Sequence, residues 1–279
     1  MTTQKIKYKI SGFFSTRVIL IVLLLSLGTY LLHLNWLAGS VHSSIPVSQH
    51  QKYPKGIPHK FDLDGNVQPF PGNTIICHLS PSSEIYASMQ VLYEKLKEHP
   101  LSHLYTMLPP SSWHMTIFEG ALDKRRKGAY WPTDLDLNVS IADCTALLEK
   151  KLESFDLQYE TPFRLSVIGF KPLGSSISIH VEPRTAEENT GIRHLRDRLA
   201  DVMKMRQKGH DKYRFHLTVA YLLRYLSDRQ EKELMEFLVG YFKDMPKELE
   251  LGLPEFCRFE DMFAFERLLY LKNMKPIGL

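Results

Sequence analysis

The chain of 279 residues is 44% hydrophobic and 24% charged, a composition that supplies a packed core and excludes a largely disordered protein. Its formal net charge of +4 resides near the N-terminus, because the chain without four basic residues there has 31 basic and 31 acidic residues. These four are Lys5, Lys7, Lys9 and Arg17. Proteins that bind duplex nucleic acid usually carry a basic surface on the folded body, so the neutral body argues against duplex DNA and favours a small or single-ended substrate.

The N-terminal segment predicts a membrane anchor. Residues 18–51 contain no Asp, Glu, Lys or Arg, and residues 18–32 are almost wholly apolar. With the apolar residues among 34–38 the span reaches about 20 residues, the length of a helix that spans a bilayer. The basic residues before the span predict a cytoplasmic tail over 1–17 and a lumenal or extracellular body. Cleavage at the small residues 38–40 is the alternative, and it would give a secreted protein of the secretory pathway.

After a polar, proline-containing stalk at 39–60, hydrophobic periodicity predicts one domain over 61–279. The expected strands are 73–79, 113–118, 163–170, 176–181, 215–221 and a β-like stretch at 256–271. The expected helices are 83–99, 141–155, 186–205 and 228–242, and 171–174 join two strands as a hairpin. This order predicts an α+β fold of two pseudo-symmetric lobes, roughly 61–160 and 161–279, with two antiparallel sheets facing a central cleft and helices outside.

The three cysteines, Cys77, Cys144 and Cys257, are far apart and include no Cys-x-x-Cys pair. They match neither a zinc ribbon nor a dense disulfide framework, and they allow at most one disulfide. We therefore expect buried free thiols.

A short pattern of His, an apolar residue, Thr and an apolar residue occurs once in each half of the body, at 114–117 and at 216–219. Side chains alternate along a strand, so His114 and Thr116 share one face, as do His216 and Thr218. By the same strict alternation, Tyr221 is expected on the opposite face. Two such strands present two imidazoles and two hydroxyls to one cleft.

The surroundings of these motifs resemble the two-histidine (2H) phosphoesterase superfamily, which is marked by one His-x-Thr/Ser-x motif in each lobe of a pseudo-symmetric α+β fold. Residues 113–120 (WHMTIFEG), 214–221 (RFHLTVAY) and 72–74 (GNT) are similar to its branch named DUF1868. The resemblance covers most of 61–279. It implies hydrolysis of a 2′,3′-cyclic phosphodiester, or of another small nucleotide or RNA-end phosphoester, without a metal or other cofactor.

The residue types fit that chemistry independently. An imidazole titrates near neutral pH, so one of His114 and His216 can take a proton from the attacking water while the other donates one to the departing oxygen. Thr116 and Thr218 can donate hydrogen bonds to the non-bridging phosphate oxygens. The sequence does not distinguish the acid from the base.

Further candidates for substrate binding are Arg126, Tyr130 and Trp131, in a basic aromatic loop after the first motif, and Arg214, which precedes His216 by two residues. A guanidinium can bind phosphate and an aromatic ring can stack on a base. A solvated loop and a rim salt bridge are the corresponding structural alternatives.

Three other interpretations compete with catalysis by the two histidines. No second ligand stands at metal-binding spacing beside either histidine, which disfavours a metal enzyme. A non-catalytic module that binds a nucleotide or a phosphorylated ligand remains the alternative function, and purely structural histidines are the third interpretation. No phosphate-binding glycine loop or serine-esterase motif is present, and we expect a monomer.

Overall fold

The computed structural model describes residues 52–274. The predicted tail, the predicted membrane span and the stalk up to residue 51 lie outside this range. None of the helices within 52–274 has the length and apolar character needed to cross a membrane.

Strands and helices follow one another in nearly the predicted order. The strands are β1 (Gly72–His78), β2 (Tyr105–Met107), β3 (His114–Leu122), β4 (Phe163–Phe170), β5 (Ser176–Pro183), β6 (His216–Leu222), β7 (Glu248–Leu251), β8 (Glu255–Phe259) and β9 (Glu266–Tyr270). The helices are α2 (Glu84–Lys97), α3 (Ile141–Glu153), α4 (Ala186–Met203) and α5 (Asp228–Phe242). Every predicted helix is thus confirmed to within a few residues.

Each helix begins at a side-chain cap that the sequence supplies. Ser83, Ser140, Thr185 and Ser227 accept hydrogen bonds from backbone N–H groups in the first turn of α2, α3, α4 and α5. Such caps satisfy backbone donors that have no partner within the helix. The predicted helix starts are therefore fixed by local chemistry.

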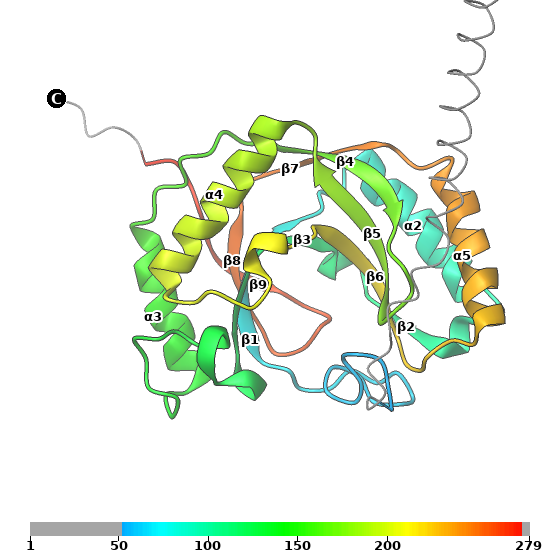
Figure 1. Ribbon diagram of the computed structural model, residues 1–279, viewed down its shortest axis with the longest axis horizontal. Helices are drawn as coiled ribbons and strands as arrows, with labels where there is room; N and C mark the ends of the chain where they lie inside the picture. The colour runs from blue at the N-terminus through cyan, green and yellow to red at the C-terminus, as the bar shows by residue number, and fades with distance from the viewer. Residues whose placement is uncertain (1–51, 275–279) are drawn as a thin grey trace, which may run out of the picture. The chain divides into compact units, whose positions relative to one another are not determined.

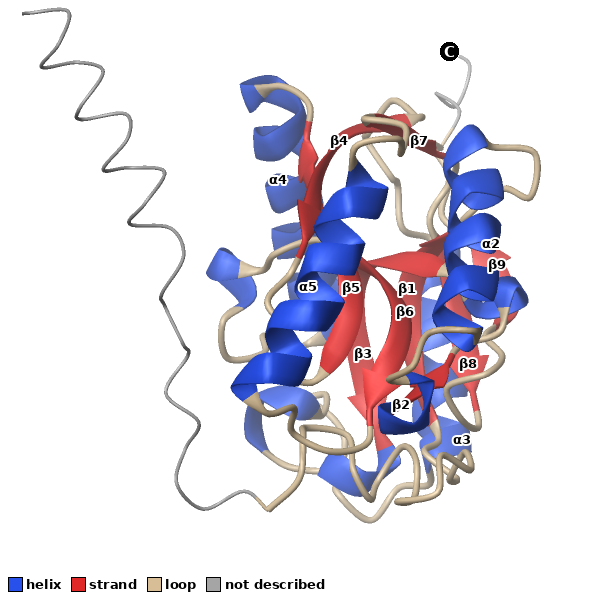
Figure 2. Ribbon diagram, turned by 90° about the vertical axis from the view of Figure 1, so that its right-hand side faces the viewer, coloured by secondary structure: helices blue, strands red, loops and turns tan. Residues whose placement is uncertain are grey.

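All strand pairs in the sheet are antiparallel, in the order β7-β4-β5-β6-β3-β1-β8-β9, with β2 paired to β6. The contact between β3 and β6 consists of one residue pair, Met115 with Leu217. Helices α3 and α4 lie on one side of the molecule and α2 and α5 on the other, with the strands between them (Figures 1 and 2). The sheet thus consists of two halves that meet where the two motifs lie.

The apolar residues of both motifs belong to the core. Met115, Ile117, Leu217 and Val219 are fully buried. Burying a side chain of this size stabilises a fold by about 1.5–3 kcal/mol. The alternation predicted for the motifs is therefore present, with the His and Thr side chains on the other face.

The structure corrects two features of the predicted architecture. The strands form one continuous sheet rather than two, because β3 pairs with β6. Strands β8 and β9, which were assigned to the second lobe, extend the first one, because β8 pairs with β1. Sequence periodicity carries no information on such long-range pairing.

The predicted start of the domain at residue 61 is also too late. Ile57 is buried in the core and Lys60 donates a hydrogen bond to the Tyr221 hydroxyl, so the end of the predicted stalk belongs to the folded body. The missed strands β2 and β7 are short, with three and four residues.

Candidate active site

The two motifs lie next to each other in antiparallel strands. Because Met115 of β3 pairs with Leu217 of β6, the antiparallel register places His114 across from Thr218 and Thr116 across from His216. The four side chains are therefore on one face of the sheet, arranged about a local two-fold axis through the Met115–Leu217 pair. The structure thus brings together the four residues that the sequence predicted as catalytic.

Both histidines are held by the same local hydrogen bond. His114 Nδ1 lies 2.7 Å from the Ser112 carbonyl oxygen, and His216 Nδ1 lies 2.8 Å from the Arg214 carbonyl oxygen. A carbonyl oxygen only accepts, so Nδ1 carries the proton in each ring. In the neutral imidazoles Nε2 is then the atom with a lone pair, and it remains for a ligand.

The two threonines have different hydrogen-bond partners. The Ser178 hydroxyl donates to Thr218 Oγ1 at 3.2 Å and lies 2.8 Å from the Ser176 hydroxyl. Thr218 thus accepts from Ser178, and its own proton remains for a ligand oxygen. Thr116 has the phenol of Tyr213 as its neighbour: burial raises the pKa of Tyr213, and the Thr116 hydroxyl opposes this shift.

A β-bulge lies at the last residue of each motif. Between β1 and β3 the register shifts at Ile117, and between β5 and β6 it shifts at Val219. An extra residue in one strand reverses the alternation beyond it. The prediction for Tyr221 was therefore wrong, because the bulge at Val219 returns Tyr221 to the face of His216 and Thr218.

Each bulge carbonyl has a hydrogen-bond partner. The buried guanidinium of Arg196 in α4 donates to the Ile117 carbonyl, and the Leu108 backbone N–H donates to the Val219 carbonyl at 2.9 Å. The Arg196 guanidinium also lies 4.2 Å from the centre of the Tyr213 ring. Arg196 therefore positions the first motif from outside the sheet, a role that no sequence pattern indicated.

Burial is the main cause of the altered acidity of both histidines, which are half-buried on the sheet face. Burial lowers the pKa of His114 to about 3 and that of His216 to about 4, and the hydrogen bonds to the Ser112 and Arg214 carbonyls oppose these shifts. The charge of Lys60 lowers both pKa values. Both rings are therefore neutral in the free protein at pH 7.

Lys60 and Phe265 complete the immediate surroundings, and both come from segments distant from the motifs. Lys60 Nζ lies 2.9 Å from the Tyr221 hydroxyl, and the Phe265 ring packs edge-on against His114 with 4.3 Å between ring centres. The loop between β8 and β9 carries Phe265, and the end of the predicted stalk carries Lys60. Neither has a sequence signal, because their positions depend on the packing of loops.

Each motif histidine also has a second histidine as its cross-strand neighbour. His78 pairs with His114 and His180 pairs with His216. His78 Nδ1 lies 3.0 Å from the buried carboxylate of Glu255, while His180 Nε2 lies 3.3 Å from the exposed carboxylate of Glu182. We call His78 and His180 the outer histidines. Neither was among the site residues predicted from the sequence.

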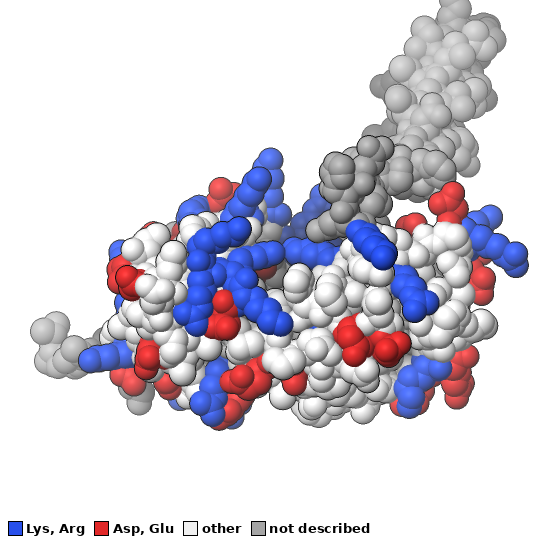
Figure 3. Space-filling model, turned by 90° about the horizontal axis from the view of Figure 1, so that it is seen from below, with Lys and Arg blue, Asp and Glu red and all other residues white. Residues whose placement is uncertain are grey.

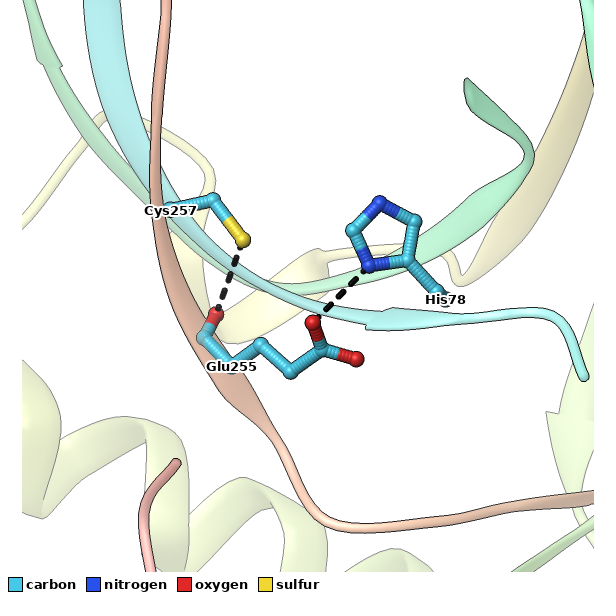
Figure 4. Close-up of side chains that lie close together, drawn as sticks. All are labelled: His78, Glu255 and Cys257. Carbon is cyan, nitrogen blue, oxygen red and sulfur yellow. Dashed lines mark hydrogen bonds and ion pairs between the residues drawn. The ribbon is translucent and has the colours of Figure 1, made fainter. Parts of the chain in front are cut away.

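One group of potential metal ligands lies next to His114. The ligand atoms of His78, Glu255 and Cys257 are all within 4.8 Å of one another (Figure 4). These donor types suit zinc, but Arg267 already lies 3.3 Å from the same Glu255 oxygen as His78, and burial raises the pKa of the Cys257 thiol to about 12. The observed contacts are those of a hydrogen-bonded ion pair. Metal independence stays a prediction.

A second group of potential ligands comprises Asp197, His210 and Asp211. Here Arg206 forms ion pairs with both aspartates, and His210 lies 3.0 Å from the Asp197 carboxylate, so these ligand atoms are already engaged with one another and with Arg206.

All three cysteines of the chain are buried and free, as predicted.

The predicted binding loop is engaged mainly in its own structure. Arg126 pairs with Asp123 and donates to the Leu137 and Val139 carbonyls. Trp131 is 1% exposed and donates to the Asp136 carbonyl, and a buried indole has no face on which a base can stack. Trp131 is therefore withdrawn as a stacking residue. Tyr130 packs against Arg125, and its role in binding stays a prediction.

Basic side chains are unevenly distributed over the surface. Figure 3 shows Lys and Arg gathered over part of one face, with acidic side chains both among them and over the rest of the face. Arg214 is exposed, and its charge lowers the pKa values of Lys171 and His180, after the larger effect of burial on each. Its predicted contact with phosphate stays a prediction.

Comparison with known proteins gives one family and several similar structures. The family model described as "2H-phosphodiest: Domain of unknown function (DUF1868)" matches residues 60–176. No curated protein matches the chain significantly. The crystal structure of a conserved protein of unknown function from Agrobacterium tumefaciens str. C58 has a TM-score of 0.75 and 27% identity, over 81% of this chain and 96% of that one.

Two more distant structures are also similar. LigT of E. coli, solved with ATP, has a TM-score of 0.41 and 11% identity over 75% of this chain and 100% of its own. TT0787 of Thermus thermophilus has a TM-score of 0.40 and 15% identity over 73% of this chain and 99% of its own.

The family match contains the first motif and all of β1, β3 and β4, and the second motif lies beyond its end. The similarity to the Agrobacterium protein extends over most of the body. Together with the two-histidine geometry, the family match supports a phosphoesterase of the hydrolase class. Residues 60–176, which contain the first motif, match the 2H-phosphodiesterase family model described as DUF1868, the branch that the motifs resemble.

Proposed function

We propose that this protein hydrolyses a 2′,3′-cyclic phosphodiester, or a related small nucleotide or RNA-end phosphoester, without a metal. The observation that carries the proposal is the matched pair of histidines. Both Nδ1 atoms are held by a carbonyl two residues earlier, and both Nε2 atoms remain for a ligand on one sheet face. A purely structural pair of histidines would not need this duplicated arrangement.

The reaction requires one proton on the histidine pair. The neutral ring accepts a proton from the attacking water as its oxygen bonds to phosphorus, and the protonated ring gives its proton to the ribose oxygen as the P–O bond breaks. Thr116 and Thr218 donate to the non-bridging oxygens, where negative charge increases in the transition state. Each turnover leaves the pair with one proton, carried by the other histidine, and exchange with water restores the first arrangement.

Binding of the anionic substrate favours protonation of one of the two histidines. Both histidines are neutral in the free protein at pH 7, but an anionic phosphodiester between them favours the charged form of an imidazole. Lys60 lies near both rings and adds positive charge at the same place. The bound phosphate therefore raises the pKa of the histidine that becomes the acid.

The test is turnover of a panel of 2′,3′-cyclic nucleotides and short RNAs with cyclic phosphate ends by the full chain in detergent, with EDTA present. The wild type should open at least one member of the panel. A protein that binds a panel member without opening any of them would be the binding module, and a protein that neither binds nor opens one would contradict the proposal.

We also propose, from the sequence alone, that residues 18–38 anchor the protein with its body on the lumenal or extracellular side, as a monomer. Residues 1–51 lie outside the described part of the chain, so this placement rests on the apolar span and the basic residues before it. Protease digestion of intact microsomes should leave the body undigested, and its digestion without detergent would contradict this orientation.

A further inference from the structure

The surface around the second outer histidine, His180, is built from three neighbouring segments. The Lys171 backbone N–H donates to the Ser178 carbonyl at 2.8 Å, which continues the pairing of β4 with β5 beyond the end of β4. Ser178 and His180 pair with Thr218 and His216 of β6. Because cross-strand partners share a face, Lys171 lies on the face that carries the second motif.

Arg214 reaches the same place from the segment before β6. Its carbonyl accepts the hydrogen bond from His216 Nδ1, which fixes its backbone two residues from the motif. The charges of Arg214 and Lys171 both act on His180, and those of Arg214 and Lys55 act on Lys171. Lys171 lies across from Ser178, two residues before His180, and Arg214 lies two residues before His216, the cross-strand partner of His180. We call Lys171, Arg214 and Lys55, whose charge acts on Lys171, the basic cluster.

The positive charges of the basic cluster are not balanced by nearby acids. Among the ion pairs within residues 52–274, none involves Lys55, Lys171 or Arg214. Burial, followed by the charges of Arg214 and Lys55, lowers the pKa of the half-buried Lys171. Glu182 pairs with His180, but its side chain is 58% exposed. Holding like charges together in this way costs stability unless an anion occupies the site.

On the His114 side of the site, the positive charge around the outer histidine His78 is balanced by a carboxylate. His78 lies beside His114 as His180 lies beside His216, but its partner Glu255 has only 8% of its side chain exposed and also pairs with Arg267. A second anion there would meet the buried carboxylate. The unbalanced positive charge is thus specific to the His216 side.

We propose that the basic cluster binds a second phosphate of the substrate, next to the phosphodiester held between His114 and His216. This inference rests on the proposed phosphoesterase function and names its substrate class: a cyclic phosphodiester that carries another phosphate on the same molecule. The guanidinium of Arg214 and the ammonium of Lys171 provide charge-assisted hydrogen bonds of the kind that phosphate accepts. The second phosphate orients the substrate, because only one side of the two-fold site accepts it.

A second phosphate has two chemical sources, a terminal monoester or the next linkage of an RNA chain. Adenosine 2′,3′-cyclic phosphate, its 5′-phosphorylated form and the dinucleotide ApA with a cyclic phosphate end separate them. We expect the full-length wild type to turn over at least one of the two doubly phosphorylated compounds with a kcat/KM about tenfold or more above that of adenosine 2′,3′-cyclic phosphate. The compound with the larger advantage identifies the source.

The variants Lys171→Gln and Arg214→Gln test the residues. For each, kcat/KM of the preferred doubly phosphorylated substrate should fall about tenfold further than kcat/KM of adenosine 2′,3′-cyclic phosphate. Lys232→Gln is the matched control, since Lys232 lies exposed on α5 and should leave the ratio unchanged. Arg214 is exposed, so its variant retains the fold even if the Lys171 variant is unstable.

A wild type without preference for a second phosphate, or variants that reduce turnover of both substrate types equally, would overturn the inference. If no compound is turned over, the proposed function fails and the inference is judged by binding of adenosine 3′,5′-bisphosphate in calorimetry. Binding that weakens about tenfold in both variants but not in Lys232→Gln supports the basic cluster as an anion site. Binding that is equal in all four proteins, or absent, overturns it.

Discussion

The His114 side and the His216 side of the site share a backbone and differ in charge. Each has a histidine held through Nδ1 by a carbonyl, a threonine two residues later, a bulge at the last residue of the motif and an outer histidine on the neighbouring strand. On the His114 side the outer histidine pairs with a buried carboxylate. On the His216 side it pairs with an exposed carboxylate and lies near cations that form no ion pair within residues 52–274. The two motif strands thus present the same reactive side chains on both sides of the site. The different charges around the outer histidines are what would orient a substrate between the two sides.

Removing either motif histidine should have the largest effect. His114→Gln and His216→Gln should each lower kcat by about 10²–10⁴, since each removes a group that transfers a proton. The double variant should be little worse than the worse single one, because the two act in one step. Steady-state kinetics on the preferred cyclic nucleotide measure this, and a variant with full activity would show that the two sides are not equivalent in chemistry.

The threonines should have a smaller and more even effect. Thr116→Val and Thr218→Val each remove a hydroxyl that donates to the phosphate, and a loss of about 10² in kcat is expected from the removal of one such donor. Ser178→Ala should cost only a few-fold and only on the His216 side, because Ser178 orients the Thr218 hydroxyl. Losses confined to KM would instead mean that the hydroxyls bind the ground state and the transition state equally.

The pH dependence distinguishes the free enzyme from the complex. Because burial lowers the pKa values of His114 and His216 to about 3 and about 4, the state with one proton on the pair becomes more populated as pH falls from 7. We expect kcat/KM to rise by up to about tenfold per pH unit from pH 7 to pH 5, while the kcat profile lies at higher pH because the bound anion raises the acid's pKa. A flat kcat/KM over this range would mean that one histidine is already charged in the free enzyme.

The smallest expected effect is on stability, and it compares the two outer pairs. Burial alone would raise the pKa of Glu255, but His78 and Arg267 outweigh it, and the net pKa lies below its ordinary value of 4.5. A lowered carboxyl pKa stabilises the fold above the unfolded pKa, and this stabilisation is lost as pH falls through the folded pKa. Glu255→Gln should therefore cost about 1–3 kcal/mol at pH 7 and progressively less below about pH 4.5.

The exposed carboxylate on the other side is the control. Glu182→Gln should change the free energy of unfolding by less than about 1 kcal/mol, because exposed ion pairs contribute little. Urea unfolding of both variants at pH 7 and pH 4 measures the difference. Equal costs at pH 7 would contradict the contrast between a buried and an exposed pair.

The sequence by itself determined the four motif residues, the helices and most of the strands of this protein. Those features are local: caps such as Ser83 start the helices, and the alternation in 114–117 and 216–219 separates buried from ligand-facing side chains. The tertiary structure alone decided what surrounds the motifs. The bulge at Val219 reverses the alternation and moves Tyr221 to the site, and Lys60 arrives from a segment that looked like a stalk.

The charge difference between the two sides was also decided only by the fold. Glu255 and Arg267 reach His78 because β8 and β9 return to pair beside β1, and Lys171 reaches His180 through the β4–β5 pairing. These contacts join residues that are far apart in the chain or follow a turn, so no local periodicity encodes them. The alternation of side chains along a strand therefore determines which residues share a face. The order of the strands in the sheet determines which charged residues of neighbouring strands lie close together.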